Sequence, residues 1–148
     1  MNADGMRPAI DVKTPAMSAS AASARSAKAV LQKNFLFRGL PESALDRIAA
    51  LATRRSYPKG AVIFSQGQPG DALFGVITGQ VRISASGAAG QEVFLNIMEP
   101  GDTFGEVAVM DGLPRTAGAC ALEDTSLIVI KRTDFLKLLE RERAGRSR

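Results

Sequence analysis

The sequence predicts a mainly β fold: a small β-roll or jelly roll, of the cupin-like double-stranded β-helix type, flanked by N- and C-terminal helices. The first observation is a series of short apolar or alternating runs between glycines over residues 57–130, a pattern typical of many short strands. The second is that the segments on either side carry apolar residues at helical spacing. With 148 residues, 45% of them hydrophobic, the chain is long enough to enclose a core as one domain.

We expect three parts along the chain. Residues 1–26 are rich in Ala and Ser and predict a flexible leader, residues 27–140 form the domain, and residues 141–148 predict a solvated basic tail. Residues 27–31 are expected to add a helical turn or two. Pro41 is expected to begin the next helix, because its missing N–H costs least in a first turn, and Arg54 and Arg55 to end it, where cations suit the helix dipole.

Strands are expected at residues 61–64, 73–77, 81–83, 92–98, 119–122 and 126–130. The second and third of these are predicted to form a hairpin around Gly79. Thr133 is expected to cap the N-terminus of a final amphipathic helix, which we expect to end within about three turns.

Composition excludes several classes of catalytic and metal site. The chain has no histidine, which removes His-ligated metals, His-ligated haem and His-based catalytic triads. Its single cysteine, Cys120, excludes an intrachain disulfide and a cluster held by several cysteines of this chain, and its apolar surroundings predict a packing role. We therefore predict that the chain is not an enzyme and holds no cofactor or metal.

Charge and hydropathy exclude further classes. The net charge of +4 is concentrated in residues 131–148, and the preceding part of the chain is close to neutral. A neutral folded part is not a basic nucleic-acid-binding surface, so we expect no specific DNA binding by this chain alone. No apolar run approaches the ~20 residues of a membrane span, and the N-terminal residues lack the apolar core that a secretory signal needs. We therefore expect a cytoplasmic protein with no membrane partner.

The most informative stretch is residues 104–117, Phe-Gly-Glu-Val-Ala-Val-Met-Asp-Gly-Leu-Pro-Arg-Thr-Ala. Gly105 lets the backbone approach a ligand closely, and a short helix after it would point unpaired N–H groups at an anion. Arg115 offers a planar fork for two phosphate oxygens. Glu106, an acceptor when ionised, suits a ribose hydroxyl and disfavours highly charged ligands. The plainer alternative is a salt bridge between Glu106 and Arg115 on a loop.

This stretch resembles the phosphate-binding cassette of cyclic-nucleotide-binding domains. The resemblance extends to Gly-x-x-Gly-Asp at residues 67–71, followed by Gly79 and Val81, and to Pro-Gly-Asp-x-Phe-Gly-Glu at residues 100–106. The chain looks most like the sensor domain of CRP/FNR-family bacterial transcription regulators, without their DNA-binding half. It departs from the pattern at Gly75, where a bulky apolar residue is usual, and we expect this to loosen one strand.

The resemblance implies a ligand site made of Phe104, Gly105, Glu106, Val107, Ala108, Arg115, Thr116 and Ala117. It implies that Glu106 holds the ribose 2′-hydroxyl and Arg115 the cyclic phosphate of cAMP, with cGMP as the alternative because Thr116 follows the arginine. Binding would be relayed through the C-terminal helix to a missing effector domain or a weak homodimer. The alternatives are a truncated DNA-binding transcription regulator and a ligand-free interaction domain.

Overall fold

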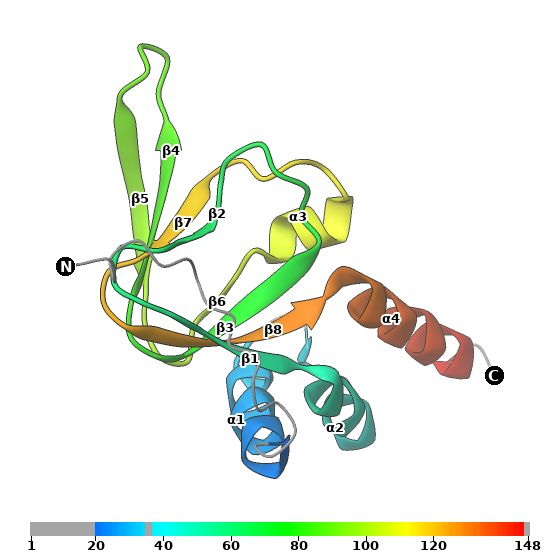
Figure 1. Ribbon diagram of the computed structural model, residues 1–148. Coiled ribbons are helices and arrows are strands. Elements are labelled where there is room, and N and C mark those ends of the chain that lie inside the picture. Colours follow the sequence, from blue (N-terminus) through cyan, green and yellow to red (C-terminus); the bar gives the residue numbers. More distant parts are fainter. Residues whose placement is uncertain (1–19, 35–36, 147–148) are drawn as a thin grey trace.

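The computed structural model describes residues 20–34 and 37–146, with side chains for residues 25–34 and 37–142. The elements are, in chain order, α1 (Ser20–Gln32), α2 (Glu42–Leu51), β1 (Thr53–Tyr57), β2 (Val62–Phe64), β3 (Ala72–Thr78), β4 (Val81–Ser86), β5 (Glu92–Met98), β6 (Thr103–Phe104), α3 (Glu106–Asp111), β7 (Gly118–Ala121), β8 (Thr125–Lys131) and α4 (Arg132–Arg146). The predicted mainly β roll with flanking helices is therefore confirmed (Figure 1).

The strands form two antiparallel four-stranded sheets. One has the order β1-β8-β3-β6, and the other has the order β2-β7-β4-β5. Helices α1, α2 and α4 lie together along the first sheet, whereas the β4–β5 hairpin projects from the opposite end of the roll (Figure 1). The short helix α3 lies between β6 and β7 in the chain, and it meets the start of α4.

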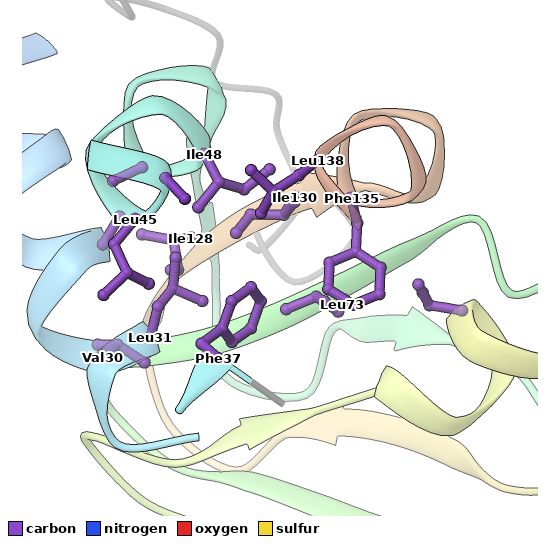
Figure 2. Packing of buried hydrophobic residues seen from close by; sticks show 14 residues of the cluster. Val30, Leu31, Phe37, Leu45, Ile48, Leu73, Ile128, Ile130, Phe135 and Leu138 are labelled. Carbon is purple, nitrogen blue, oxygen red and sulfur yellow. The ribbon is translucent and has the colours of Figure 1, made fainter. Parts of the chain in front are cut away.

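Alternate side chains of β3 and β8 build two separate clusters. Leu73, Ile128 and Ile130 face the helices and pack with residues of α1, α2 and α4, as Figure 2 shows. Phe74 and Val129 face the other sheet, where they join a second cluster. Because successive residues of a strand point to opposite faces, a strand covered on both faces has the near-continuous apolar sequence seen in β8.

Two aromatic side chains pack at the centre of the helical layer. Phe37 and Phe135 are both almost fully buried, and their rings meet edge to face at 5.5 Å between centroids (Figure 2). Phe135 belongs to α4, so this contact joins the C-terminal helix to the segment between α1 and α2. Helix α1 is also held to α2 by Lys28, whose Nζ lies 2.6 Å from Glu42 Oε2 and 2.8 Å from Asp46 Oδ1.

Helix α1 approaches the sheet closely at Gly75. A Cβ added to Gly75 would lie 2.7 Å from Val30 Cγ1 and 3.0 Å from Ile128 Cγ1. Strand β3 nevertheless runs unbroken through Gly75, which pairs with Ile128 and Thr103 on its two sides. The missing side chain therefore makes room for a helix, a role that the sequence pattern did not indicate.

Two predictions about the helices and strands are wrong. Helix α2 ends at Leu51 with Ala52 extended, and Arg54 and Arg55 lie in strand β1. Their backbone pairs with Ile128 and Leu127 of β8, and this long-range ladder outweighs the local preference of arginine for a helix end.

The predicted hairpin around Gly79 is also wrong, because its arms belong to different sheets. β3 pairs with β8 and β6, whereas β4 pairs with β5 and β7. Gly79, with φ of 95°, turns the chain from one sheet to the other where a Cβ would collide with Thr125. The true hairpin is β4–β5.

Both ends of the chain are more helical than expected. Helix α1 begins at Ser20, inside the segment expected to be a leader, and residues 1–19 lie outside the described residues. Helix α4 begins at Arg132, so Thr133 is in its first turn and is not the N-cap, and it continues to Arg146 through the segment expected to be a tail. Good helix formers such as Leu, Glu and Arg explain that continuation.

Candidate functional site

The first part of the site is the junction between β6 and α3, at Gly105. Gly105 has φ of 86°, in the left-handed region, and stands at the N-cap of α3. Only glycine adopts this conformation without strain. A Cβ at this position would also lie 2.8 Å from Arg115 Nη1. Gly105 is therefore required both for the turn and for the close approach of the arginine.

Arg115 is buried and its position is set by backbone groups. Its Nη1 donates to Gly105 O at 2.9 Å, and its Nη2 donates to Ala72 O at 2.6 Å. Its own main-chain N–H donates to Gln68 O at 2.8 Å, and its carbonyl accepts from Gly67 N at the same distance. These contacts, from two loops and the first residue of β3, hold the guanidinium in one place.

The guanidinium of Arg115 lies against an aromatic ring. Its Cζ is 4.1 Å from the centroid of Phe64, a distance at which the ring face attracts a cation. Its Nε is buried and has no hydrogen-bond partner among the described residues. Burial lowers the pKa of Arg115, and the negative charge of Asp71 opposes that shift. Since arginine deprotonates only at very high pH, a fixed cation with an unused donor remains.

Glu106, the first residue of α3, supplies a carboxylate acceptor, whereas Arg115 supplies a cationic donor. Its Oε1 is buried and has no hydrogen-bond partner among the described residues. Burial raises the pKa of the Glu106 carboxyl, and a hydrogen bond from its own backbone N–H partly offsets this. Within the described part of the chain no ion pair joins Glu106 to Arg115, so the salt-bridge alternative is not what the structure contains.

A cavity of about 290 Å³ opens between α3, β5 and the loop that precedes β7. All eight residues singled out in the sequence line it: Phe104, Gly105, Glu106, Val107, Ala108, Arg115, Thr116 and Ala117. Its volume is close to the lower end of the range for small-molecule sites, roughly 300–1,000 Å³. A cation, a carboxylate and backbone N–H groups thus meet at one cavity.

Several lining residues were not singled out in the sequence: Phe64, Ile83, Leu95, Met98, Thr103, Asp111, Leu113 and Pro114. Leu95, Val107 and Leu113 are more than half exposed, so the cavity has an apolar rim open to solvent. The signal in the sequence was the mainly apolar strand β5, interrupted only by Asn96 after its first residue, Glu92. Its side chains are largely exposed, although strand alternation would place half of them inward.

The rest of the described chain offers neither a metal site nor a membrane span. No group of three or more Cys, Asp or Glu side chains that could hold a metal ion occurs among the described residues. None of the described helices has the length and apolar character needed to cross a membrane. Cys120 lies in β7, as expected, but is only partly buried.

A small antiparallel roll with an anion-suited cavity at a short helix defines a ligand-binding domain. The family model described as "Cyclic nucleotide-binding domain" matches residues 54–142. The chain therefore belongs to the cyclic nucleotide-binding domain family, and it is of the CRP-like type found in bacterial regulators. The match begins in β1, so α1 and α2 lie outside it.

Known relatives agree with this assignment. The chain is 42% identical over 106 residues to the "Cyclic AMP receptor protein" of Thermus thermophilus, covering 72% of this chain and 49% of that protein. It is 32% identical over 103 residues to the "CRP-like cAMP-activated global transcriptional regulator" of Mycobacterium tuberculosis, covering 70% and 46%. Among solved structures, the N-terminal domain of a transcriptional regulator from Streptomyces coelicolor aligns with a TM-score of 0.70 and 28% identity, covering 80% and 84%. The chain spans about half the length of these curated relatives.

Proposed function

We propose that the chain is a sensor domain that binds cAMP, with Arg115 on the cyclic phosphate and Glu106 on the ribose 2′-hydroxyl. One observation carries this proposal: a fixed guanidinium with an unused donor and a buried carboxylate with an unused acceptor line the same small cavity. An unsatisfied buried polar group costs about 1–3 kcal/mol. A ligand that supplies one anionic acceptor and one hydroxyl donor would remove both costs.

The same pair of residues argues against other nucleotides. A cyclic phosphate carries one negative charge, which Arg115 can balance. The carboxylate of Glu106 would repel the additional charges of a di- or triphosphate. The names of the two curated relatives above are a cyclic AMP receptor protein and a cAMP-activated regulator, which favours cAMP. The alternative is cGMP, because Thr116 lines the cavity and its hydroxyl could bond a guanine amino group.

We further propose that binding is relayed through α4. Arg132, the first residue of α4, donates from Nε to Val109 O at 2.8 Å, and Val109 is a buried residue of α3. A shift of α3 toward the ligand would thus pull directly on the start of α4. Such a coupling requires that the ligand favours one of two arrangements of this contact. The domain itself would perform no catalysis and would act in the cytoplasm on a DNA-binding or other effector domain, or as a weak homodimer.

Isothermal titration calorimetry on the 148-residue chain tests the proposal. We expect saturable one-site binding of cAMP, weaker binding of cGMP, and little heat from 5′-AMP, whose phosphate carries a second charge and is not cyclic. The 2′-deoxy analogue of cAMP should bind more weakly than cAMP because it lacks the hydroxyl for Glu106. Absence of binding by both cyclic nucleotides would support the ligand-free interaction domain instead.

A further inference from the structure

A second cavity lies on the other side of Arg115, between β1, β2 and the junction of β8 with α4. Its volume is about 610 Å³. Four cationic side chains line it, those of Arg55, Arg115, Lys131 and Arg132, against the single carboxylate of Asp71. The cassette does not account for this cavity, since apart from Arg115 none of these residues lines the first one.

The cations of this second cavity, called the rear cavity below, are only partly balanced within the protein, because Asp71 is the single carboxylate among them. The ion pairs among the described residues involve Lys28, Arg47 and Arg82, and none involves a cation of the rear cavity. Placing like charges around one concave surface is unfavourable unless a counter-charge enters. A cleft lined by one sign of charge also raises the local concentration of ions of the opposite sign.

The strand pattern explains why two of the cations reach this cavity. Arg55 lies two residues before the buried Tyr57 in β1, so both are on the inner face of the roll, and its Nη1 donates to Tyr57 Oη at 3.3 Å. Lys131 lies two residues after the buried Val129 in β8, on the same inner face. Both cations therefore stand where the inner cluster of the roll ends and solvent begins.

Beneath the cations the cavity is apolar. Ile63, Phe64, Phe74 and Val129 line it, and all four belong to the inner cluster or pack against it. An apolar floor with a few converging charged groups is the usual composition of a small-molecule site. Inorganic anions would use the cations alone, whereas an organic anion would also cover the floor.

We propose that the rear cavity is a second binding site, for a small organic anion with an apolar body and a phosphate or carboxylate group. The anionic group meets Arg55, Lys131 and Arg132, and the apolar body covers the partly exposed Ile63 and Phe64. This inference goes beyond the cyclic-nucleotide function and does not depend on it. Because Arg115 lines both cavities, the two sites share one wall.

Amide chemical shifts of the ¹⁵N-labelled 148-residue chain test the proposal, with phenyl phosphate as the probe at constant ionic strength. We expect saturable shifts at the amides of β1, at residues 68–72 and at the β8–α4 junction. Inorganic phosphate should bind at least about threefold more weakly, because it cannot cover the apolar floor. Equal affinity for the two probes, or shifts confined to residues 105–117, would overturn the proposal.

Two charge variants and a matched control complete the test. Arg55→Gln and Lys131→Gln should each weaken phenyl phosphate binding about threefold, and the double variant about tenfold. Arg54→Gln is the control, because Arg54 is the neighbouring arginine on the opposite face of β1 and contacts Ser126 instead. Equal losses in Arg54→Gln and Arg55→Gln would contradict the site. Since cAMP calorimetry is a separate measurement, failure of one proposal leaves the other intact.

Discussion

The helical layer and the cassette differ in how closely their residues pack. On the helical side, Leu31, Ile48, Ile130 and Phe135 fill the space between sheet and helices, and each is almost fully buried. In the cassette, apolar residues such as Leu113 remain exposed around a cavity. Close packing stabilises the first region, whereas the second keeps polar groups unsatisfied.

The residues that stabilise the fold are therefore largely different from those expected to bind a ligand. A filled core gains free energy from every buried methylene, about 0.8 kcal/mol each, and leaves no space for a ligand. A site must instead keep a cavity and hold charges such as those of Arg115 and Glu106 away from protein partners, which costs stability until the ligand arrives. Changes in the helical layer should therefore alter unfolding, and changes in the cassette should alter binding.

The largest expected effect is that of Arg115→Ala on cAMP affinity. The change removes at least two charge-assisted hydrogen bonds, worth ~1.5–3 kcal/mol each, so affinity should fall more than about 100-fold. Arg115→Lys should lose nearly as much, because lysine keeps the charge but not the planar fork. Calorimetry measures both variants.

The controls for Arg115→Ala follow from its protein contacts. Because Arg115 also donates to Gly105 O and Ala72 O, the variant should lose some stability, and its circular dichroism spectrum should be checked for an intact roll. Native affinity in a folded Arg115→Ala variant would contradict the assignment of the site.

The next effect tests the helical side. Gly75→Val should destabilise the domain by ~1–3 kcal/mol, the usual cost of overpacking a filled core, because its Cβ would meet Val30 and Ile128. Urea denaturation measures this change. The double variant Gly75→Val with Val30→Ala should recover part of the loss, since it removes the Cγ1 atom in contact. Unchanged stability in Gly75→Val would show that α1 does not need this close approach.

The helical side and the cassette also differ in how far the sequence predicts them. The cassette is local, so the resemblance of one short stretch of sequence was enough to choose eight residues that all line one cavity. The strands were mostly predictable from alternation, but their partners were not. Gly79 looks like a hairpin turn in sequence, whereas long-range pairing sends its two flanking strands to different sheets. The rim from β5, including Leu95, likewise depends on a contact between distant segments.

Glu106→Gln should have opposite effects on binding and stability. Gln can still accept a bond from the ribose hydroxyl, but without charge assistance, so cAMP affinity should fall only a few-fold and the preference over 2′-deoxy cAMP should shrink. The free domain should gain stability at neutral pH, because the change removes an ionised, partly buried carboxylate whose Oε1 has no hydrogen-bond partner among the described residues. Calorimetry and thermal unfolding measure the two effects.

The gain in folding stability from Glu106→Gln should depend on pH and should be larger at higher pH. Burial raises the pKa of Glu106 in the folded state above its unfolded value. Between the two values the native chain binds more protons than the unfolded chain, so Glu106 makes stability fall as pH rises through this interval. The stability advantage of Glu106→Gln should therefore be largest above the folded pKa and shrink as pH falls. An advantage that grows toward acid pH would mean that Glu106 has a stabilising partner.

The smallest effect on affinity should come from Arg132→Gln, which tests the contact between the two regions. Arg132 touches the cassette through Val109 O but does not line the first cavity, so cAMP affinity should change by no more than about twofold.

Hydrogen exchange of the first turn of α4 should respond to cAMP in the native chain and should lose that response in the variant, because the hydrogen bond that joins α4 to α3 is gone. Arg141→Gln, an exposed change later in α4, is the matched control and should keep the response. If Arg132→Gln keeps it as well, the relay must pass instead through packed side chains such as Phe135, and the cassette and the helical layer would then be joined by their shared core.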